Sequence, residues 1–309
     1  METRYARISD EEIEMLRKRI GIEVPRRQPH IEIITKDAIR HFAYGIGDTN
    51  PLWTDEECAQ KTQYKSLIAP PCTLYSTDLI VSGNVGGLPG VHAMFAGTNW
   101  EWFLPIKLGE RIIGSSRLSR LEEKQSEFAG RTFLQSYETI FRNQGGEIVA
   151  RAESFCIRSE RETAREKGKY KTITRQSYTG EQLKAIEADY DREEIRGARP
   201  RYWEEVRIGD ELTPIVKGPI TITDMIAWLM GWGGLFIRAH RRGLEYRRRH
   251  PAAAIPDPFG IPDVPERVHW DNDFARQVGA PAAYDYGPQR ISWLGQLMTN
   301  WMGDDGFLK

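Results

Sequence analysis

The sequence has 309 residues, of which 40% are hydrophobic and 28% are charged. These proportions are typical of a globular protein with enough apolar side chains to fill a core, and they exclude disorder over most of the chain. The 43 basic and 44 acidic side chains leave a formal net charge of -1. The overall charge therefore indicates neither a nucleic acid nor an anionic membrane as a partner.

The N-terminal residues lack the apolar core of a signal peptide, and no uninterrupted apolar run reaches the roughly 18 residues of a membrane span. We therefore expect a cytoplasmic protein. The cysteines Cys58, Cys72 and Cys156 are odd in number and lack metal-ligand spacing. They predict neither a disulfide framework nor a metal site, and free cysteine is typically a small buried residue.

The first elements are predicted from local patterns. Residues 10–20 are typical of a short surface helix, and residues 31–34 alternate as in a strand. Thr35 is a suitable N-cap for the helix that follows, which the turn-forming cluster at residues 47–53 must end. Pro71 predicts the start of a buried helix, because proline is favoured in a first turn and its neighbours are apolar.

The next part of the chain is typical of an antiparallel sheet. The extended segments are residues 98–103, 110–121, 131–142 and 147–158. Asn143-Gln144-Gly145-Gly146 joins the last two and is a strong hairpin signal. A helix followed by such a meander predicts an α+β domain in which the sheet wraps around the helix.

The sequence then repeats itself beyond a charged connector at residues 159–178 and a linker helix at residues 178–196. Residues 221–228 resemble residues 34–41, with Asp37 matching Asp224 at an offset of 187. Residues 269–275 resemble residues 53–59 at an offset of 216. The larger second offset indicates an insertion rich in Arg, Pro and Ala, and a second buried helix begins at Gly287.

The second copy is predicted to be incomplete. Only residues 303–309 follow its buried helix, whereas a meander of four strands followed the first. Either another chain supplies the missing strands or the second unit uses fewer strands. The predicted domains are residues 1–165, a charged linker at residues 166–200, and residues 201–309 with an inserted segment at residues 235–267.

One motif carries a family resemblance. Gly47-Asp48-Thr49-Asn50-Pro51-Leu52, with Ile68-Ala69-Pro70-Pro71 downstream, resembles the MaoC-like dehydratases and R-specific enoyl-CoA hydratases, whose site motif reads Asp-x-Asn-Pro-Leu/Ile-His. The resemblance covers residues 35–158 and 202–301 and is similar to the double-hotdog acyl dehydratases. It implies antiparallel sheet wrapped around long central helices, a CoA thioester substrate, and reversible hydration of the α,β double bond. That reaction needs neither a metal nor a redox cofactor.

The two copies each keep one member of the implied catalytic pair, a carboxylate and an imidazole that hold a water molecule. Asp48 and Asn50 match the motif in the first copy, but Trp53 stands in the position of the family's histidine. In the second copy His269 takes that position, but the equivalent of Asp48 falls near Gly234.

Three explanations remain open. His269 could work with a substitute acid, Asp48 and His269 could meet across the pseudo-twofold axis, or a partner chain could carry the catalytic pair. The candidate acids are Asp257, Asp263, Glu266, Asp271 and Asp285. Backbone amides at the helix starts near Pro71 and Gly287 are candidates to meet the thioester oxygen as it gains negative charge.

A basic run at residues 238–250 lies in the predicted insertion. Guanidinium groups match phosphate oxygens, so Arg238 is a candidate substrate-binding residue, as are Asn50 and Arg290. A solvated helix face and a partner contact are the alternatives for this run.

The sequence as a whole predicts an acyl-CoA hydratase or dehydratase. The alternatives are a non-catalytic acyl-CoA-binding subunit of a heteromeric hydratase and an acyl-CoA thioesterase. We expect a homo-oligomer or a complex with a small hotdog partner, and neither nucleic acid nor membrane as a partner.

Overall fold

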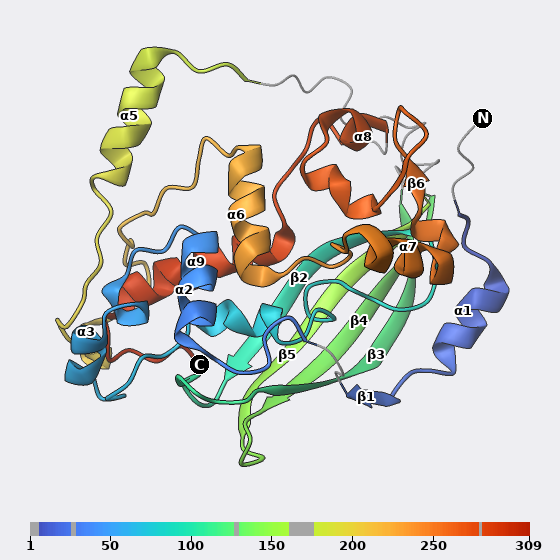
Figure 1. The fold of residues 1–309 in the computed structure, drawn as a ribbon. Helices are drawn as coiled ribbons and strands as arrows, with labels where there is room; N and C mark the ends of the chain where they lie inside the picture. Colours follow the sequence, from blue (N-terminus) through green and yellow to red (C-terminus); the bar gives the residue numbers. More distant parts are fainter. Residues whose placement is uncertain (1–5, 26–28, 127–129, 161–175, 278–279) are drawn as a thin grey trace.

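The computed structural model describes residues 6–25, 29–126, 130–160, 176–277 and 280–309. A curved antiparallel sheet carries helices on its concave side and at one end (Figure 1). Its strand order is β1-β3-β4-β5-β2. The strands are β1 (Glu23–Pro25), β2 (His92–Trp102), β3 (Ile113–Ser126), β4 (Gly130–Arg142) and β5 (Ile148–Ser159). The α-helices are α1 (Asp10–Arg17), α2 (Lys36–Gly45), α3 (Glu56–Lys61), α5 (Gly180–Tyr190), α6 (Ile222–Trp232), α7 (His240–Arg249), α8 (Asn272–Gln277) and α9 (Gly287–Met302).

Three of the four strands of the predicted meander pair as predicted, but the first, β2, pairs with β5 and not with β3. Strands β3, β4 and β5 pair in sequence order, and β2 joins the far side of β5. The hairpin forms where it was predicted, because the Asn143 side-chain oxygen accepts hydrogen bonds from the backbone of Gly145 at 3.0 Å and Glu147 at 3.1 Å. The side-chain amide thus satisfies backbone donors within the turn.

Two predictions about the first half differ from the structure. Thr35 does cap α2, but the predicted strand at residues 31–34 makes only an isolated bridge, between Ile33 and Arg111. The buried helix at Pro71 is a short 3-10 helix, η2 (Pro71–Ser76), rather than a long central helix. Hydroxyl groups compete for its carbonyls, as when Thr77 Oγ1 donates to Leu74 O at 3.0 Å.

The second half repeats the first in the order of its helices. Helix α6 begins at Ile222 and is the counterpart of α2, which begins at Lys36, close to the first offset of the repeat. The starts of α3 and α8, and those of η2 and α9, are separated by the larger second offset. The chain between α6 and α8 is thus longer than its counterpart in the first half, and α7 lies in this extra length. The domain boundaries themselves stay a prediction.

A close crossing of α2 and α6 joins the two halves. Gly45 and Gly231 hold the same place in the two helices, counted from each helix start. A Cβ atom on Gly45 would lie 2.9 Å from Ala227 O, and one on Gly231 would lie 2.5 Å from His41 O. Any side chain at either position would push the helices apart, so both positions require glycine.

The second half adds no strand to the main sheet in the part of the chain that the structure describes. Its strands there are the short pair β6 (Ile255–Pro256) and β7 (Pro262–Asp263). The predicted linker helix is α5, which stands away from the main body and buries no side chain (Figure 1). The charged connector at residues 159–178 lies largely outside the described residues. No described helix is long and apolar enough to cross a membrane.

Candidate functional site

The family motif of the first half forms a closed turn. Asp48 is buried, and its Oδ1 accepts a hydrogen bond from the backbone of Asn50 at 3.0 Å. Its Oδ2 accepts from the indole nitrogen of Trp53 at 2.8 Å. Burial raises the pKa of Asp48, and these hydrogen bonds oppose the shift. Trp53, which stands at the position of the family's histidine, thus forms a hydrogen bond with the carboxylate that would pair with that histidine.

Asn50 and Lys217 connect this turn to the second half. Asn50 Oδ1 caps η1 (Pro51–Trp53) by accepting from Leu52 N at 3.0 Å, and its Nδ2 donates to Asn300 on α9 at 3.4 Å. Lys217 Nζ donates to Ile46 O at 2.8 Å and Gly47 O at 3.2 Å. These contacts give the motif a structural role at the junction of the two halves.

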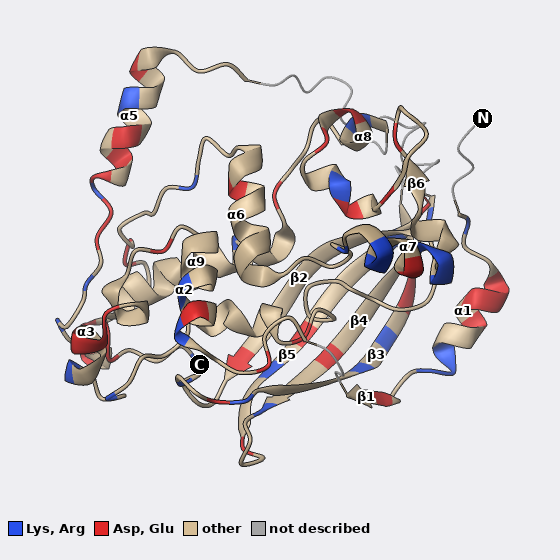
Figure 2. Cartoon of the chain, viewed as in Figure 1, with Lys and Arg blue, Asp and Glu red and all other residues tan. Residues whose placement is uncertain are grey.

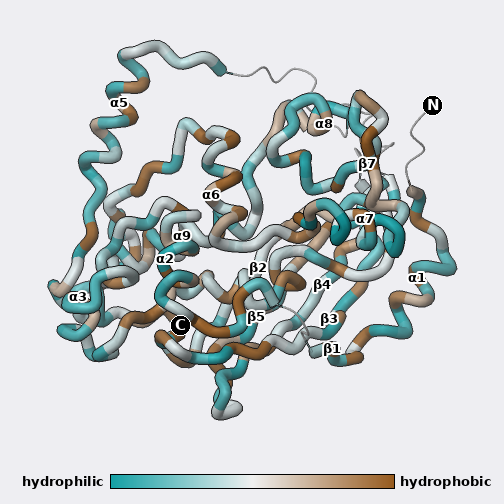
Figure 3. The backbone as a smooth tube through the Cα atoms, in the orientation of Figure 1, coloured by the Kyte–Doolittle hydropathy of each residue, from teal (hydrophilic) through white to brown (hydrophobic). Residues whose placement is uncertain are grey.

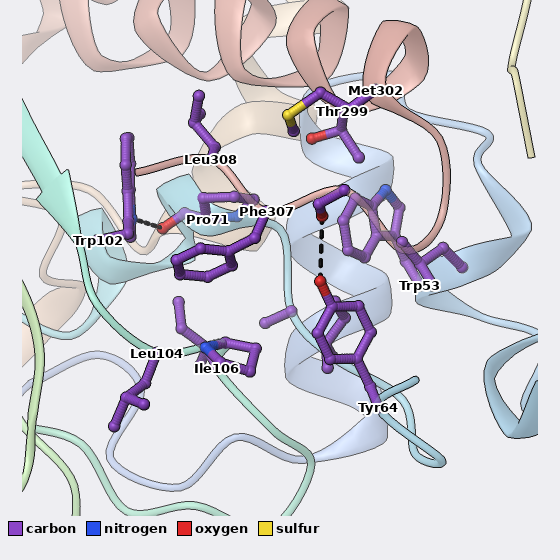
Figure 4. Close-up of a pocket in the computed structure, with 15 residues that line it drawn as sticks. Trp53, Tyr64, Pro71, Trp102, Leu104, Ile106, Thr299, Met302, Phe307 and Leu308 are labelled. Carbon is purple, nitrogen blue, oxygen red and sulfur yellow. Dashed lines mark hydrogen bonds between the residues drawn. The ribbon is translucent and has the colours of Figure 1, made fainter. Parts of the chain in front are cut away.

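The small pocket beside this motif is too narrow for an acyl chain. Its volume is about 30 Å³, close to that of one water molecule. Figure 4 shows Phe307 and Leu308 of the C-terminal segment beside Pro71 and Trp102 in this pocket. Tyr64 Oη holds the segment by donating to Gly306 O at 3.0 Å. Pro71, predicted as part of a thioester site, therefore lies against the protein's own chain.

A larger cavity lies around His269. Its volume is about 360 Å³, and we call it the His269 cavity. Residues 83–93 of the first half form one wall. The other wall comes from Leu235, Phe236, α7 and the 3-10 helix η5 (Pro265–His269). Asp48 does not line this cavity, so the structure does not bring Asp48 and His269 together across the pseudo-twofold axis.

The His269 ring is held in one orientation. Its Nδ1 donates to Tyr284 O at 2.7 Å, and its ring stacks on Tyr286 with centroids 3.7 Å apart. Because a carbonyl can only accept, Nδ1 carries the hydrogen and Nε2 is left as the nitrogen that can take a proton. This arrangement is that of an oriented base.

Burial lowers the pKa of His269 to about 4. The neutral ring therefore predominates at pH 7. Below pH 6.5, the ordinary pKa of histidine, this side chain binds a proton in the unfolded chain but not in the folded protein. The stability of the folded protein therefore decreases as the pH is lowered from 6.5 toward 4. We expect this group to make the free energy of unfolding about 2 kcal/mol lower at pH 5 than at pH 7.

Urea titrations of wild type and His269→Phe at both pH values measure this contribution as a difference. The variant should lose most of it, whereas His41→Gln, at an exposed site on α2, should keep it. An equal pH dependence in wild type and His269→Phe would contradict a buried neutral imidazole.

Four of the five candidate acids are engaged elsewhere. Asp271 caps α8 by accepting from Asp273 N and Phe274 N, and it pairs with Arg267. Asp285 forms a two-pronged ion pair with Arg290, although its charge still opposes the lowering of the pKa of His269. The remaining two accept backbone hydrogen bonds in turns, as Asp257 does from Phe259 and Ile261 and Asp263 does from Val264.

Glu266 is the candidate acid that lines the His269 cavity. Its carboxylate accepts from the backbone of Leu235 at 3.0 Å and Phe236 at 2.7 Å, and from Tyr286 Oη at 3.2 Å. Burial raises the pKa of Glu266. The carboxylate thus fixes the tyrosine on which His269 stacks.

Gly287 begins α9 as predicted, but it is covered. A Cβ atom there would overlap the ring of Phe95 on β2, so glycine is needed for this close approach. Gly287 does not line the His269 cavity. Arg290, one turn further along α9, is directed to Asp285. The roles predicted for Gly287 and Arg290 in substrate binding therefore stay predictions.

Arg158 is a feature of the cavity that the sequence analysis missed. This buried side chain of β5 donates to Leu88 O at 2.7 Å, Gln135 Oε1 at 2.9 Å and Gly87 O at 3.2 Å. It also reaches Val91 O and His92 O. Burial lowers its pKa. The guanidinium therefore holds the wall at residues 83–93. The sequence feature that could have identified Arg158 is a charged residue at the inward end of a strand.

The fold is that of a hotdog protein, in which an antiparallel sheet curves around a buried helix. A solved MaoC-like dehydratase matches 93% of this chain and 79% of its own, with a TM-score of 0.60 and 17% sequence identity. Residues 19–152 match the family model "FAS1-like, dehydratase domain region".

Curated proteins are similar to part of this chain. A UPF0336 protein of Streptomyces avermitilis is 23% identical over 148 residues, which cover 46% of this chain and 95% of that protein. A probable enoyl-CoA hydratase alpha subunit of Thermomonospora curvata is 25% identical over 130 residues, which cover 36% of this chain and 40% of that protein. The chain thus shares the fold of a MaoC-like dehydratase, and its residues 19–152 are similar to dehydratase-region proteins.

Proposed function

We propose that this protein hydrates an enoyl-CoA, or dehydrates the corresponding 3-hydroxyacyl-CoA, in the His269 cavity. The observation that carries the proposal is the oriented neutral imidazole of His269, which lines a cavity of about 360 Å³. A volume of this size suits a small ligand, whereas the pocket beside Asp48 holds about 30 Å³.

The proposed chemistry uses this base and one carboxyl group. Nε2 of His269 takes a proton from water as the oxygen adds to the β-carbon, and a proton is then delivered to the α-carbon of the enolate. We assign the delivery of this proton to the carboxyl group of Glu266, because it lines the same cavity and its raised pKa favours proton exchange. Dehydration runs through the same steps in reverse.

The test is a crotonyl-CoA assay with two readouts. Hydration removes the absorbance of the enoyl thioester, whereas a thioesterase releases free CoA thiol. Loss of absorbance without thiol release supports the proposal. Thiol release alone would instead favour the thioesterase. Neither signal from the chain alone, with hydration that appears only when its partner is added and survives His269→Ala, would favour a binding subunit.

We also propose that a small hotdog subunit covers α9. The helix buries a polar and small-residue face, whose members include Ser292, Gly295 and Thr299. Leu294 is 58% exposed, and Leu297 and Met298 are half-buried at helical spacing on the outer side. This pattern is the reverse of that of a helix with a solvent-facing outer side.

The counterpart of α9 shows what is missing. In the first half, η2 packs against β2 of the main sheet, where Trp102 Nε1 donates to Pro71 O at 3.2 Å and the ring of Tyr75 contacts that of Trp100. The described strands of the second half do not cover α9 in this way. Helix α6 also leaves Ile226 and Met230 exposed, and Figure 3 shows brown segments along it. The relative named as an alpha subunit supports a complex of unlike chains.

Leu294→Glu is expected to prevent this assembly. A charge in a buried apolar interface costs several kcal/mol, enough to lower affinity by more than about 100-fold. The chain is co-expressed with the products of adjacent genes, and the mass of the purified complex is measured by light scattering.

Leu183→Glu is the matched control, because Leu183 is 40% exposed on α5, which buries no side chain. The control should keep the mass of the wild-type complex. A complex that forms equally well with Leu294→Glu would contradict docking on α9.

A further inference from the structure

Helix α7 carries a concentrated positive charge at the edge of the His269 cavity. Figure 2 shows its arginines in blue above one end of the sheet. The arginines in and beside this helix are Arg238, Arg241, Arg242, Arg247, Arg248 and Arg249. Helix α7 lies in the extra length between α6 and α8, which the first half does not have.

One side of α7 belongs to the cavity. Tyr246 and His250 both line it. Residues three or four apart share a side of a helix, so Arg242 and Arg249 lie on the side of Tyr246. Arg241 and Arg248 lie on the opposite side by the same rule. The helix therefore divides its arginines between a cavity side and an outer side.

The arginines near the cavity affect the pKa values of groups that line it. Burial raises the pKa of Tyr246, and the charges of Arg238 and Arg249 oppose that shift. Arg238 acts on Glu266 in the same sense. Among the described residues of α7, the ion pair that forms is Arg241 with Glu245, at 3.0 Å on the outer side. Arg249 Nε donates to Glu245 O at 3.3 Å, which leaves its terminal nitrogens, together with the guanidinium of Arg242, to bind an anion.

The same side of α7 carries a pair of stacked rings. The rings of Tyr246 and His250 have centroids 4.4 Å apart and an interplanar angle of 28°. Phe236 lies beside Tyr246, with centroids 5.9 Å apart. His250 is exposed, so its outer ring surface is accessible. Aromatic rings stack with nucleobases, and guanidinium groups bind phosphates.

We propose that Arg242, Tyr246, Arg249 and His250 bind the adenosine phosphate end of a CoA thioester. Phosphates would lie on the two guanidinium groups and the base on the stacked rings, with the acyl end directed toward His269. This inference rests on the proposed function, which supplies the CoA thioester. An acidic carrier protein would use the arginines but would leave the aromatic pair without a role.

Binding of adenosine 3′,5′-bisphosphate, measured by titration calorimetry, tests the inference without any hydration. Arg242→Gln with Arg249→Gln should raise its Kd at least about 10-fold, because the probe loses the charge-assisted hydrogen bonds of two guanidinium groups. The matched control is Arg241→Gln with Arg248→Gln, which removes the same charge from the outer side and should change Kd less than about 3-fold. His269→Ala should bind the probe as wild type does.

Three results would overturn the inference. The probe does not bind to wild type, or both double variants weaken its binding equally. In the third, Arg242→Gln with Arg249→Gln weakens the binding of an acyl carrier protein thioester but not that of the probe. Failure of the proposed function is distinguishable from these. In that case the probe binds and Arg242→Gln with Arg249→Gln weakens it, but crotonyl-CoA is not hydrated. Conversely, hydration with equal KM for crotonyl-CoA and crotonyl-pantetheine would retain the function and exclude the nucleotide site.

Discussion

His269→Ala is expected to lower kcat for crotonyl-CoA hydration by about 10²- to 10⁴-fold, the usual contribution of a positioned general base. The variant loses the nitrogen that Tyr284 O and Tyr286 hold in place, and no other described imidazole stacks on Tyr286. Binding of substrate should change much less than kcat, because the rest of the His269 cavity remains. Initial rates over a range of substrate concentrations separate the two effects.

Asp48→Asn is the matched control for this experiment. Its side-chain oxygen can still accept a hydrogen bond in the turn, and Asp48 lies outside the His269 cavity. We expect kcat within about 3-fold of wild type, since the change removes no group from the reaction site. The reverse pattern, a loss with Asp48→Asn and full activity with His269→Ala, would place the reaction at the first motif. Full activity of both variants would assign the catalytic pair to the partner.

Arg158→Met is expected to destabilise the protein by about 3–5 kcal/mol. The substitution removes the donor that the carbonyls of residues 87, 88, 91 and 92 share, although Leu88 O still accepts from Val91 N at 3.2 Å. Each buried acceptor that is left without a donor costs about 1–3 kcal/mol. The wall at residues 83–93 should loosen as a result. Urea unfolding measures the loss of stability, and hydrogen exchange of the amides in this wall shows where it occurs.

Arg151→Met is the matched control on the same strand. Arg151 is exposed and lies over the ring of Phe103, so its loss should cost less than about 1 kcal/mol. Arg158→Lys should give an intermediate loss, because one ammonium group cannot reach all the carbonyls that the planar guanidinium serves. A stability of Arg158→Met equal to that of Arg151→Met would show that the loop does not depend on this side chain.

The sequence alone predicted the features that depend on short spacings. Strands β3, β4 and β5, their hairpin at Asn143 and the cap at Thr35 all follow from contacts within a few residues. The family resemblance also follows from one short motif, and it implied the hotdog fold. The repeat was visible as two offsets, although the starts of α2 and α6 differ slightly from the predicted register.

Tertiary structure decided which of the candidate residues share a site. The indole of Trp53 turns back to Asp48, and Arg290 turns to Asp285, so these carboxylates are satisfied by partners that no spacing rule identified. The His269 cavity joins a loop before β2 to segments that come much later in the chain. Contacts over such separations depend on how whole elements pack, and here the close crossing of α2 and α6 at Gly45 and Gly231 sets how the two halves meet.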